Sequence, residues 1–296
     1  DGSVKKMPCT VQDYVFDDFS ITQQGLVYAG INTDFNEITW FYASKNSTVI
    51  DRCVTYNYLE NSWYTNSMAR TTWIDRGVYE LPYATEFEAA ETGTIPTITG
   101  VTAGASIVYL HEDGVNNDVE PLEAFIQSGD FDIQDGEQML SIARFIPDFK
   151  DQVGSADVLL SFKDYNSITN ETTLNGAITN SATTITLTNS TQFPTAGTLL
   201  IGTELITYTA NNETTGVLTG CVRGTSDTSA AAHIDNKKVT NYTNVRINLS
   251  NVTPTTTKID TRGRGRQGNV VISSNAVNDN WRFGTLRLDV KPDGGR

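Results

Sequence analysis

The sequence has few of the residues that build disulfide frameworks, metal sites or catalytic triads. Its three cysteines, Cys9, Cys53 and Cys221, are odd in number and far apart, so we expect free thiols and not a disulfide framework or a paired-cysteine metal site. The two histidines, His111 and His233, have no cysteine or histidine nearby at ligand spacing. No apolar run approaches the ~20 residues that a membrane helix requires.

Basic residues are also scarce, because 35 acidic residues stand against 21 basic ones and give a net charge of −14. This balance disfavours nonspecific adhesion to nucleic acid or to an anionic membrane. The chain nevertheless has 12 Tyr, 12 Phe and 4 Trp, which indicates a folded protein and not a disordered acidic tail. Its 296 residues suffice for one large domain or two smaller ones.

Apolar and polar residues alternate in short runs, such as residues 38–42 and 54–58, and turn signals such as Asp113-Gly and Asp135-Gly recur between the runs. Helical periodicity is nearly absent. The pattern predicts an antiparallel all-β fold. Propeller blades, a sandwich and a jelly roll would all give this alternation, and the aromatic strand pairs favour a β-propeller-type body with partial blades.

Composition changes sharply between residues 170 and 243. These 74 residues contain 20 threonines and no tryptophan, yet apolar residues still alternate at 184–188, 198–203 and 204–209. We therefore predict a small Thr-rich β-module at 170–243, inserted into a body made of residues 1–169 and 244–296. The strands on either side, which begin at Val158 and Val245, are expected to pair as a hairpin that carries the module at its tip.

Arg262, Arg264 and Arg266 lie at alternate positions, so an extended strand would present all three on one face and the intervening glycines on the other. One interpretation is phosphate contact with DNA, but no aromatic residue between the arginines offers base stacking. The preferred interpretation is a set of structural or intersubunit ion pairs. The candidate carboxylates are those of Asp130, Asp132, Asp260 and Asp289.

No motif indicates a catalytic residue, a metal site or a cofactor. Residues 130–137 contain several carboxylates, but they lack the spacing and the distal glutamate of a calcium loop. An enzymatic alternative remains, because a pair of carboxylates can hydrolyse glycans. The candidates for such a pair are Glu86, Glu88, Glu91, Glu112 and Asp113.

Several short blocks, in the right order, resemble the C-terminal part of the tail nozzle (tail tubular) proteins of short-tailed bacteriophages. The likeness covers most of residues 1–169 and 244–296, and its blocks are residues 35–42, 51–58, 69–77, 128–133, 262–267 and 281–296. The resemblance implies a virion structural protein in the tail, a propeller-containing subunit of a ring through which DNA leaves the particle.

The same resemblance implies the partners. They are further copies of the chain in a ring, with a hexamer expected, other tail proteins such as the adaptor and fibres, DNA in passage without sequence-specific binding, and the host cell surface. Nozzle proteins are usually longer, and this chain begins Asp1-Gly-Ser, so we expect a fragment of a larger polypeptide. The alternative is a tail-associated protein that binds or hydrolyses glycans, or a receptor-binding role for the Thr-rich module.

Overall fold

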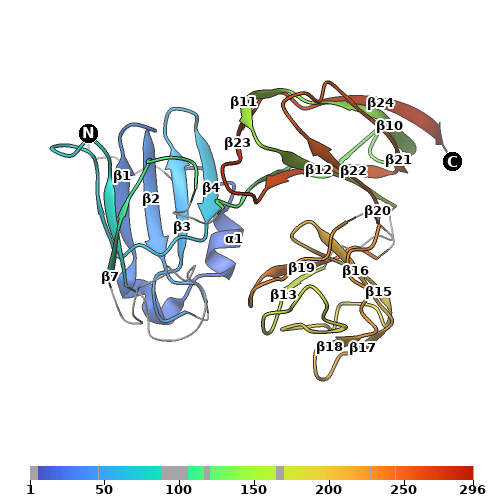
Figure 1. The fold of residues 1–296 in the computed structure, drawn as a ribbon, viewed down its shortest axis with the longest axis horizontal. Coiled ribbons are helices and arrows are strands. Elements are labelled where there is room, and N and C mark those ends of the chain that lie inside the picture. The colour runs from blue at the N-terminus through green and yellow to red at the C-terminus, as the bar shows by residue number, and fades with distance from the viewer. Residues whose placement is uncertain are drawn as a thin grey trace. The chain divides into compact units, whose positions relative to one another are not determined.

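The computed structural model describes residues 6–45, 47–87, 106–116, 121–164, 170–226, 228–243 and 245–295. Strands make up 50% of it and helices 5%, and every paired strand is antiparallel, so the predicted antiparallel all-β class is confirmed. The chain forms two compact units, Asp1–Gly114 and Val115–Arg296 (Figure 1). No helix in the described part is long and apolar enough to cross a membrane.

The first unit, unit 1, opens with a short helix, α1 (Gln12–Asp17), and a 3-10 turn at Ile21–Leu26. Four strands then follow one another as a meander in chain order (Figure 1). They are β1 (Tyr28–Asn32), β2 (Glu37–Tyr42), β3 (Arg52–Asn57) and β4 (Ser62–Asn66). The strands predicted at 38–42 and 54–58 are therefore confirmed as β2 and β3.

A second meander in unit 1 consists of β5 (Thr72–Ile74), β6 (Tyr83–Phe87) and β7 (Ser106–Leu110). Trp73 of β5 packs on β1, where a Cβ at Gly30 would stand 2.6 Å from the indole Cγ. The indole N–H of Trp73 donates to the carbonyl of Ile31 at 2.8 Å. Trp73 also packs on the cluster of Phe41, Ile50 and Cys53, so one aromatic side chain joins the two meanders.

The body of the second unit, unit 2, is a pair of sheets packed face to face. One sheet has the order β20-β12-β22-β8 with β9 beside β22, and the other has the order β21-β10-β24. Leu140 and Phe145 of β10 meet Val158 and Phe162 of β12 in one apolar core. Among the described residues no sheet closes into a barrel or a propeller. The bounds of these strands are β8 (Ala124–Gln127), β9 (Phe131–Asp132), β10 (Gln138–Ile146), β12 (Ala156–Lys163), β20 (Arg246–Val252), β21 (Ile259–Gly265), β22 (Gln267–Ser274) and β24 (Arg287–Gly295).

A small two-stranded sheet of β11 (Phe149–Val153) and β23 (Asn280–Phe283) adds to this body. Trp281 of β23 packs edge-on against Phe149, with ring centroids 5.8 Å apart. Both side chains lie against the sandwich core, so this sheet extends the same apolar cluster.

The hairpin predicted around the Thr-rich module is confirmed, because β12 pairs with β20 and Phe162 lies opposite Arg246. Within the module, β13-β19-β15-β16 form one sheet and β14-β18-β17 form another. Glu171 of β13 pairs with Thr240 of β19, which brings the two ends of the module together. The bounds are β13 (Glu171–Thr173), β14 (Thr184–Thr186), β15 (Gly197–Ile201), β16 (Glu204–Tyr208), β17 (Ala210–Asn212), β18 (Val217–Thr219) and β19 (Lys238–Asn241).

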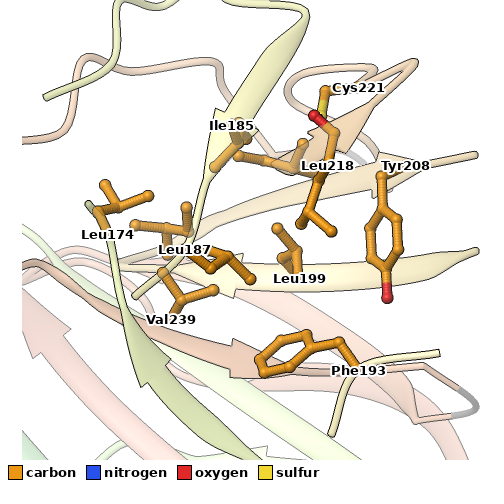
Figure 2. Close-up of a cluster of buried hydrophobic side chains, with 11 residues drawn as sticks. Leu174, Ile185, Leu187, Phe193, Leu199, Tyr208, Leu218, Cys221 and Val239 are labelled. Atoms are coloured by element: carbon orange, nitrogen blue, oxygen red, sulfur yellow. The ribbon is translucent and has the colours of Figure 1, made fainter. Parts of the chain in front are cut away.

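The module has an apolar core of its own, in which side chains such as Leu174, Leu187 and Leu199 converge from both of its sheets (Figure 2). The alternation that predicted strands at 184–188, 198–203 and 204–209 places these side chains inside. A second small cluster joins the module to the body, since Leu205 and Tyr242 pack with Leu159 of β12. Whether residues 170–243 fold without the body remains a prediction.

Candidate functional site

Of the three arginines predicted to share one strand face, Arg262 and Arg264 lie on β21 with the predicted alternation, whereas Arg266 lies between β21 and β22. Arg262 and Arg264 are exposed, whereas Gly263 and Gly265 are buried on the opposite face. The ring of Phe162 from β12 fills the space beside Gly263, while Gly265 lies against the Cβ of Phe162 and the backbone carbonyl of Lys163. The glycine face of β21 therefore packs on the sandwich core, and the two arginines lie on the solvent-exposed face.

A shallow groove of about 370 Å³ runs beside these arginines, between β20 and β21. Each strand is the outer strand of its own sheet, so the groove lies between two sheet edges. The side-chain amide of Asn248 donates to the hydroxyl of Thr261 and ties the two strands together. We call this feature the arginine groove; its lining residues are Phe162, Arg246, Ile247, Asn248, Arg262, Gly263 and Arg264.

The three arginines that line the groove, Arg246, Arg262 and Arg264, have different partners. Arg246 contacts the carboxylate of Asp164 at 3.1 Å and donates from Nε to the carbonyl of Arg264 at 2.8 Å. Arg264 contacts the carboxylate of Asp293 at 3.0 Å. Arg262 has no ion pair in the described part of the chain. Three arginines and the two aspartates that they contact leave a net charge of +1 on an acidic protein.

Both ion pairs are about half exposed, and exposed pairs contribute only about 0–1 kcal/mol to stability. Folding therefore gains little from these arginines. Their planar guanidinium groups present several N–H donors that suit the two oxygens of a carboxylate or phosphate. The lining contains no histidine, carboxylate or thiol that could act as a base or nucleophile, so the chemistry that the groove supports is anion binding.

The other predicted residues of the row lie elsewhere. Arg266 donates to the carbonyls of Gly136 and Glu137, at 2.9 and 3.4 Å, and does not line the groove. Asp130 pairs with Lys163 at 2.9 Å and not with an arginine of the row. Asp132 lies in β9 opposite Gln267.

Within one chain Arg264 pairs with an aspartate other than those named from the sequence, and pairing across a subunit boundary stays a prediction. Arg264 takes Asp293, while Asp260 contacts Arg144 at 3.1 Å and Asp289 contacts Lys291 at 3.6 Å. The reason is topological. The strand that carries Asp132 joins β22 and not β21, and β24 brings Asp293 up to Arg264 from the far end of the chain.

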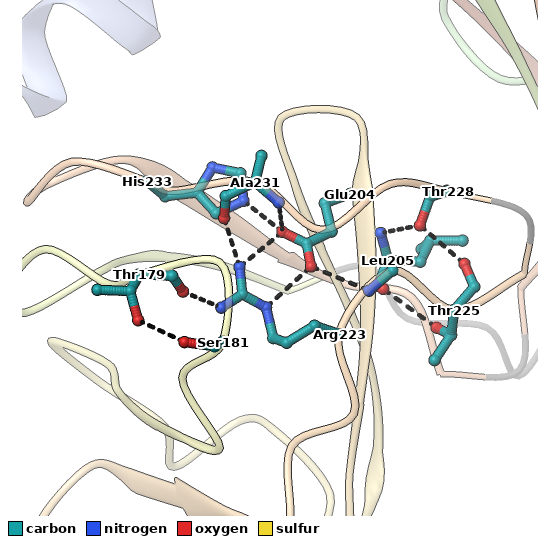
Figure 3. A network of polar contacts seen from close by, with 10 residues as sticks. Thr179, Ser181, Glu204, Leu205, Arg223, Thr225, Thr228, Ala231 and His233 are labelled. Carbon is teal, nitrogen blue, oxygen red and sulfur yellow. Dashed lines mark hydrogen bonds and ion pairs between the residues drawn. The ribbon is translucent and has the colours of Figure 1, made fainter.

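A buried polar network in the module was missed by sequence reasoning (Figure 3). Glu204 begins β16, and its carboxylate accepts from Arg223 Nε at 2.8 Å, from the amides of Gly224 and Ala231, and from His233 Nε2 at 2.8 Å. Arg223 also donates to the carbonyls of Thr179 and Ala231. The available signal was a glutamate at the start of a strand whose other residues are mostly apolar.

The protonation states of this network follow from burial and hydrogen bonding. Burial raises the pKa of Glu204, but the hydrogen bonds from Arg223, Ala231 and His233 outweigh it and bring the pKa below the ordinary value. Burial lowers the pKa of His233, so the neutral ring donates its Nε2–H to Glu204. Because Glu204 and Arg223 bind backbone groups at residues 179, 224 and 231, the network holds these loops together and serves the fold.

A second buried network lies in unit 1. Arg70 contacts Glu86 at 2.7 Å and donates from Nε to Nε2 of His111 at 2.9 Å. Its guanidinium also lies 3.7 Å from the centre of the Tyr109 ring. Burial, followed by the charge of Arg70, lowers the pKa of His111 to about 4.

Glu86, one of the carboxylates proposed for glycan cleavage, belongs to this network, because it is buried and paired with Arg70. Glu112, another candidate, accepts a hydrogen bond from Asn32 at 2.8 Å. Glu88 and Glu91 lie outside the described residues. No group of three or more His, Cys, Asp or Glu within the described ranges could hold a metal ion.

Comparison with known protein families gave no match, and comparison with curated proteins gave no match either.

Proposed function

We propose that this chain is a structural subunit of the tail nozzle of a short-tailed bacteriophage, present in the virion as one copy in a ring, with a hexamer expected. The observation that carries the proposal is the arginine groove. It is an exposed cationic surface between two sheet edges of an acidic chain, and its lining offers anion binding without catalytic groups. Such a surface suits contact with another protein subunit. The blockwise resemblance to nozzle proteins supplies the biological setting.

The two meanders of unit 1 support a propeller in the assembled protein. A four-stranded antiparallel meander such as β1-β2-β3-β4 is the unit from which propeller blades are built, and β5-β6-β7 forms a three-stranded one beside it. We propose that these sheets are two blades. A closed propeller requires roughly four to eight blades, so further blades must join them.

The role of the chain toward DNA would be geometric and electrostatic. A net charge of −14 repels phosphate weakly, which lets a polymer slide past, whereas a basic wall would retain it. Asp164 and Asp293 beside the arginines also weaken the attraction of the groove for a polyanion. The groove is therefore assigned to carboxylates of a protein partner and not to DNA.

Electron microscopy of intact tails, together with native mass spectrometry of the tail protein, tests this function. We expect a cyclic oligomer with a central pore. A protein that is monomeric within intact tails would overturn the proposal. If that monomer also cleaved host polysaccharide, the glycan-hydrolase alternative would replace it.

A further inference from the structure

Three loops of unit 1 lie together at one end of its meanders. The loop between β1 and β2 meets the loop between β3 and β4, where the amide of Tyr58 donates to the carbonyl of Asn36 at 3.0 Å. It also meets the loop between β5 and β6, where Arg76 pairs with Asp34 at 2.6 Å. The amide of Thr33 donates to the carboxylate of Asp75. These contacts make residues 33–36, 58–61 and 75–80 one surface, which we call the loop end.

The loop end exposes large apolar side chains. Val78 is 99% exposed and Leu59 is 71% exposed, and Phe35, Tyr58 and Tyr79 are each about half exposed on the same loops. Single exposed apolar residues are ordinary, but five on adjoining loops form a patch of the kind that marks interaction sites. A shallow hollow of about 490 Å³ lies between Thr33 and residues 76–80.

The loop end is also acidic. Its four carboxylates, those of Asp34, Glu60, Asp75 and Glu80, and its one arginine, Arg76, leave a net charge of −3. Asp34 and Asp75 are engaged by contacts within the surface. Glu60 and Glu80 are exposed and have no ion pair among the described residues. Two carboxylates are thus available to a cationic partner, while an anionic membrane or a nucleic acid would be repelled.

We propose that the loop end of one copy docks on the arginine groove of the next copy of this chain. The inference rests on the proposed ring. Charge complementarity carries it, because the groove gathers three arginines on a chain in which acidic residues outnumber basic ones. Arg262, which has no ion pair among the described residues, and Arg264, which also contacts Asp293, repeat along β21 at about 7 Å. Two carboxylates of the partner can therefore lie side by side along the strand.

The two surfaces are different, so the contact is heterologous and joins copies head to tail. Contacts of this type generate rings when the rotation between copies closes. Glu60 and Glu80 supply the carboxylates, and Leu59, Val78 and Tyr79 are covered by the neighbouring copy. The arginines bind a protein surface in this arrangement and not DNA.

Charge reversal tests the contact in the assembled tail protein. Variant A carries Arg262→Glu and Arg264→Glu, and variant B carries Glu60→Arg and Glu80→Arg. We expect each variant alone to need about tenfold or more higher concentration for ring assembly, because like charges then meet across the contact. A mixture of A and B should assemble again, since in a hexamer with alternating A and B copies every contact joins one positive surface with one negative surface.

The matched control for variant A is Lys150→Glu with Arg282→Glu, which makes the same change of charge at exposed positions of β11 and β23 that do not line the groove. It should assemble like the original protein. Rings that form unaffected in A and B overturn the docking contact and leave the nozzle function standing. Failure of the A and B mixture to assemble overturns the pairing of these two surfaces. Absence of rings in the original protein overturns the nozzle function itself.

Discussion

The ring of Phe162 occupies the space in which a side chain at position 263 would have to stand. A Cβ built on Gly263 would lie 1.6 Å from Cζ and 1.8 Å from Cε2 of that ring. Phe162 is fully buried in the sandwich core and cannot move aside cheaply. Packing thus requires glycine at position 263, while Arg262 and Arg264 lie on the opposite, exposed side of β21.

Replacing Gly263 with alanine should therefore destabilise unit 2 by about 3 kcal/mol, the upper part of the range for overpacked cores. Gly129→Ala is the matched control, because a Cβ there meets nothing within 4 Å. Urea unfolding of both variants measures the difference. Equal stability of the two variants would show that the ring yields more easily than the packing suggests.

Glu204→Ala should lower the stability of the Thr-rich module by about 3–5 kcal/mol, since it leaves Arg223 buried without its carboxylate. Amide hydrogen exchange in β16 reports the loss. Glu171→Ala, which removes an exposed pair with Lys238, should cost at most about 1 kcal/mol. A result in which both variants behave alike would remove the structural role assigned to the network.

The pKa of Glu204 adds a pH dependence to the same site. Because the folded pKa is depressed, the stabilisation is present above the ordinary glutamate pKa of about 4.3 and is lost as pH falls through the folded pKa. The module should therefore lose protection in acid below about pH 4. The Glu204→Ala variant should lack this acid transition.

Unit 1 should have its own acid sensitivity at a higher pH. The pKa of His111 is about 4 in the folded unit against an ordinary value of 6.5, so the unfolded chain takes up the proton first. Stability should then fall as pH drops from 6.5 toward 4. His111→Gln, which keeps an acceptor for Arg70, should flatten this slope. Tryptophan fluorescence of a Trp281→Phe background reports on unit 1 alone, and unchanged slopes would contradict the assignment.

Replacing residues 171–243 by an Asn-Gly turn should leave the sandwich folded, because β12 and β20 pair directly. The deletion uncovers Leu159 and Val271, which Leu205 and Tyr242 of the module help to cover. We therefore expect a folded but aggregation-prone protein. Adding Leu159→Thr and Val271→Thr should restore solubility, as measured by light scattering. A deletion variant that fails to fold would place the module within the core of the body.

Patterns within short stretches of the sequence predicted the strands and the insertion, because these features depend on residues close together in the chain. Alternation identified β2, β3, β14, β15 and β16, and the change in composition identified the insertion between β12 and β20. The arginine face of β21 followed from a period of two. These features depend only on neighbours along the chain.

Features that depend on distant partners escaped prediction. The sequence around Asp130 does not indicate that β9 pairs with β22. It therefore does not predict the ion pair between Asp130 and Lys163. Glu204 and His233 lie 29 positions apart and meet only because the loops of the module fold back on β16. The division after Gly114 was likewise invisible, because strands of similar composition lie on both sides of it.

The pairing of β13 with β19 has a consequence for how unit 2 folds. Between β12 and β20 the chain runs through 82 residues, a long loop to close before these strands can meet. Once the module has formed, Asn241 donates to the carbonyl of Asn170 and only about a dozen residues remain to be closed. The entropic cost of bringing β12 to β20 then falls by about 2 kcal/mol. An insertion that folds before the sandwich would in this way speed the closure of the sandwich.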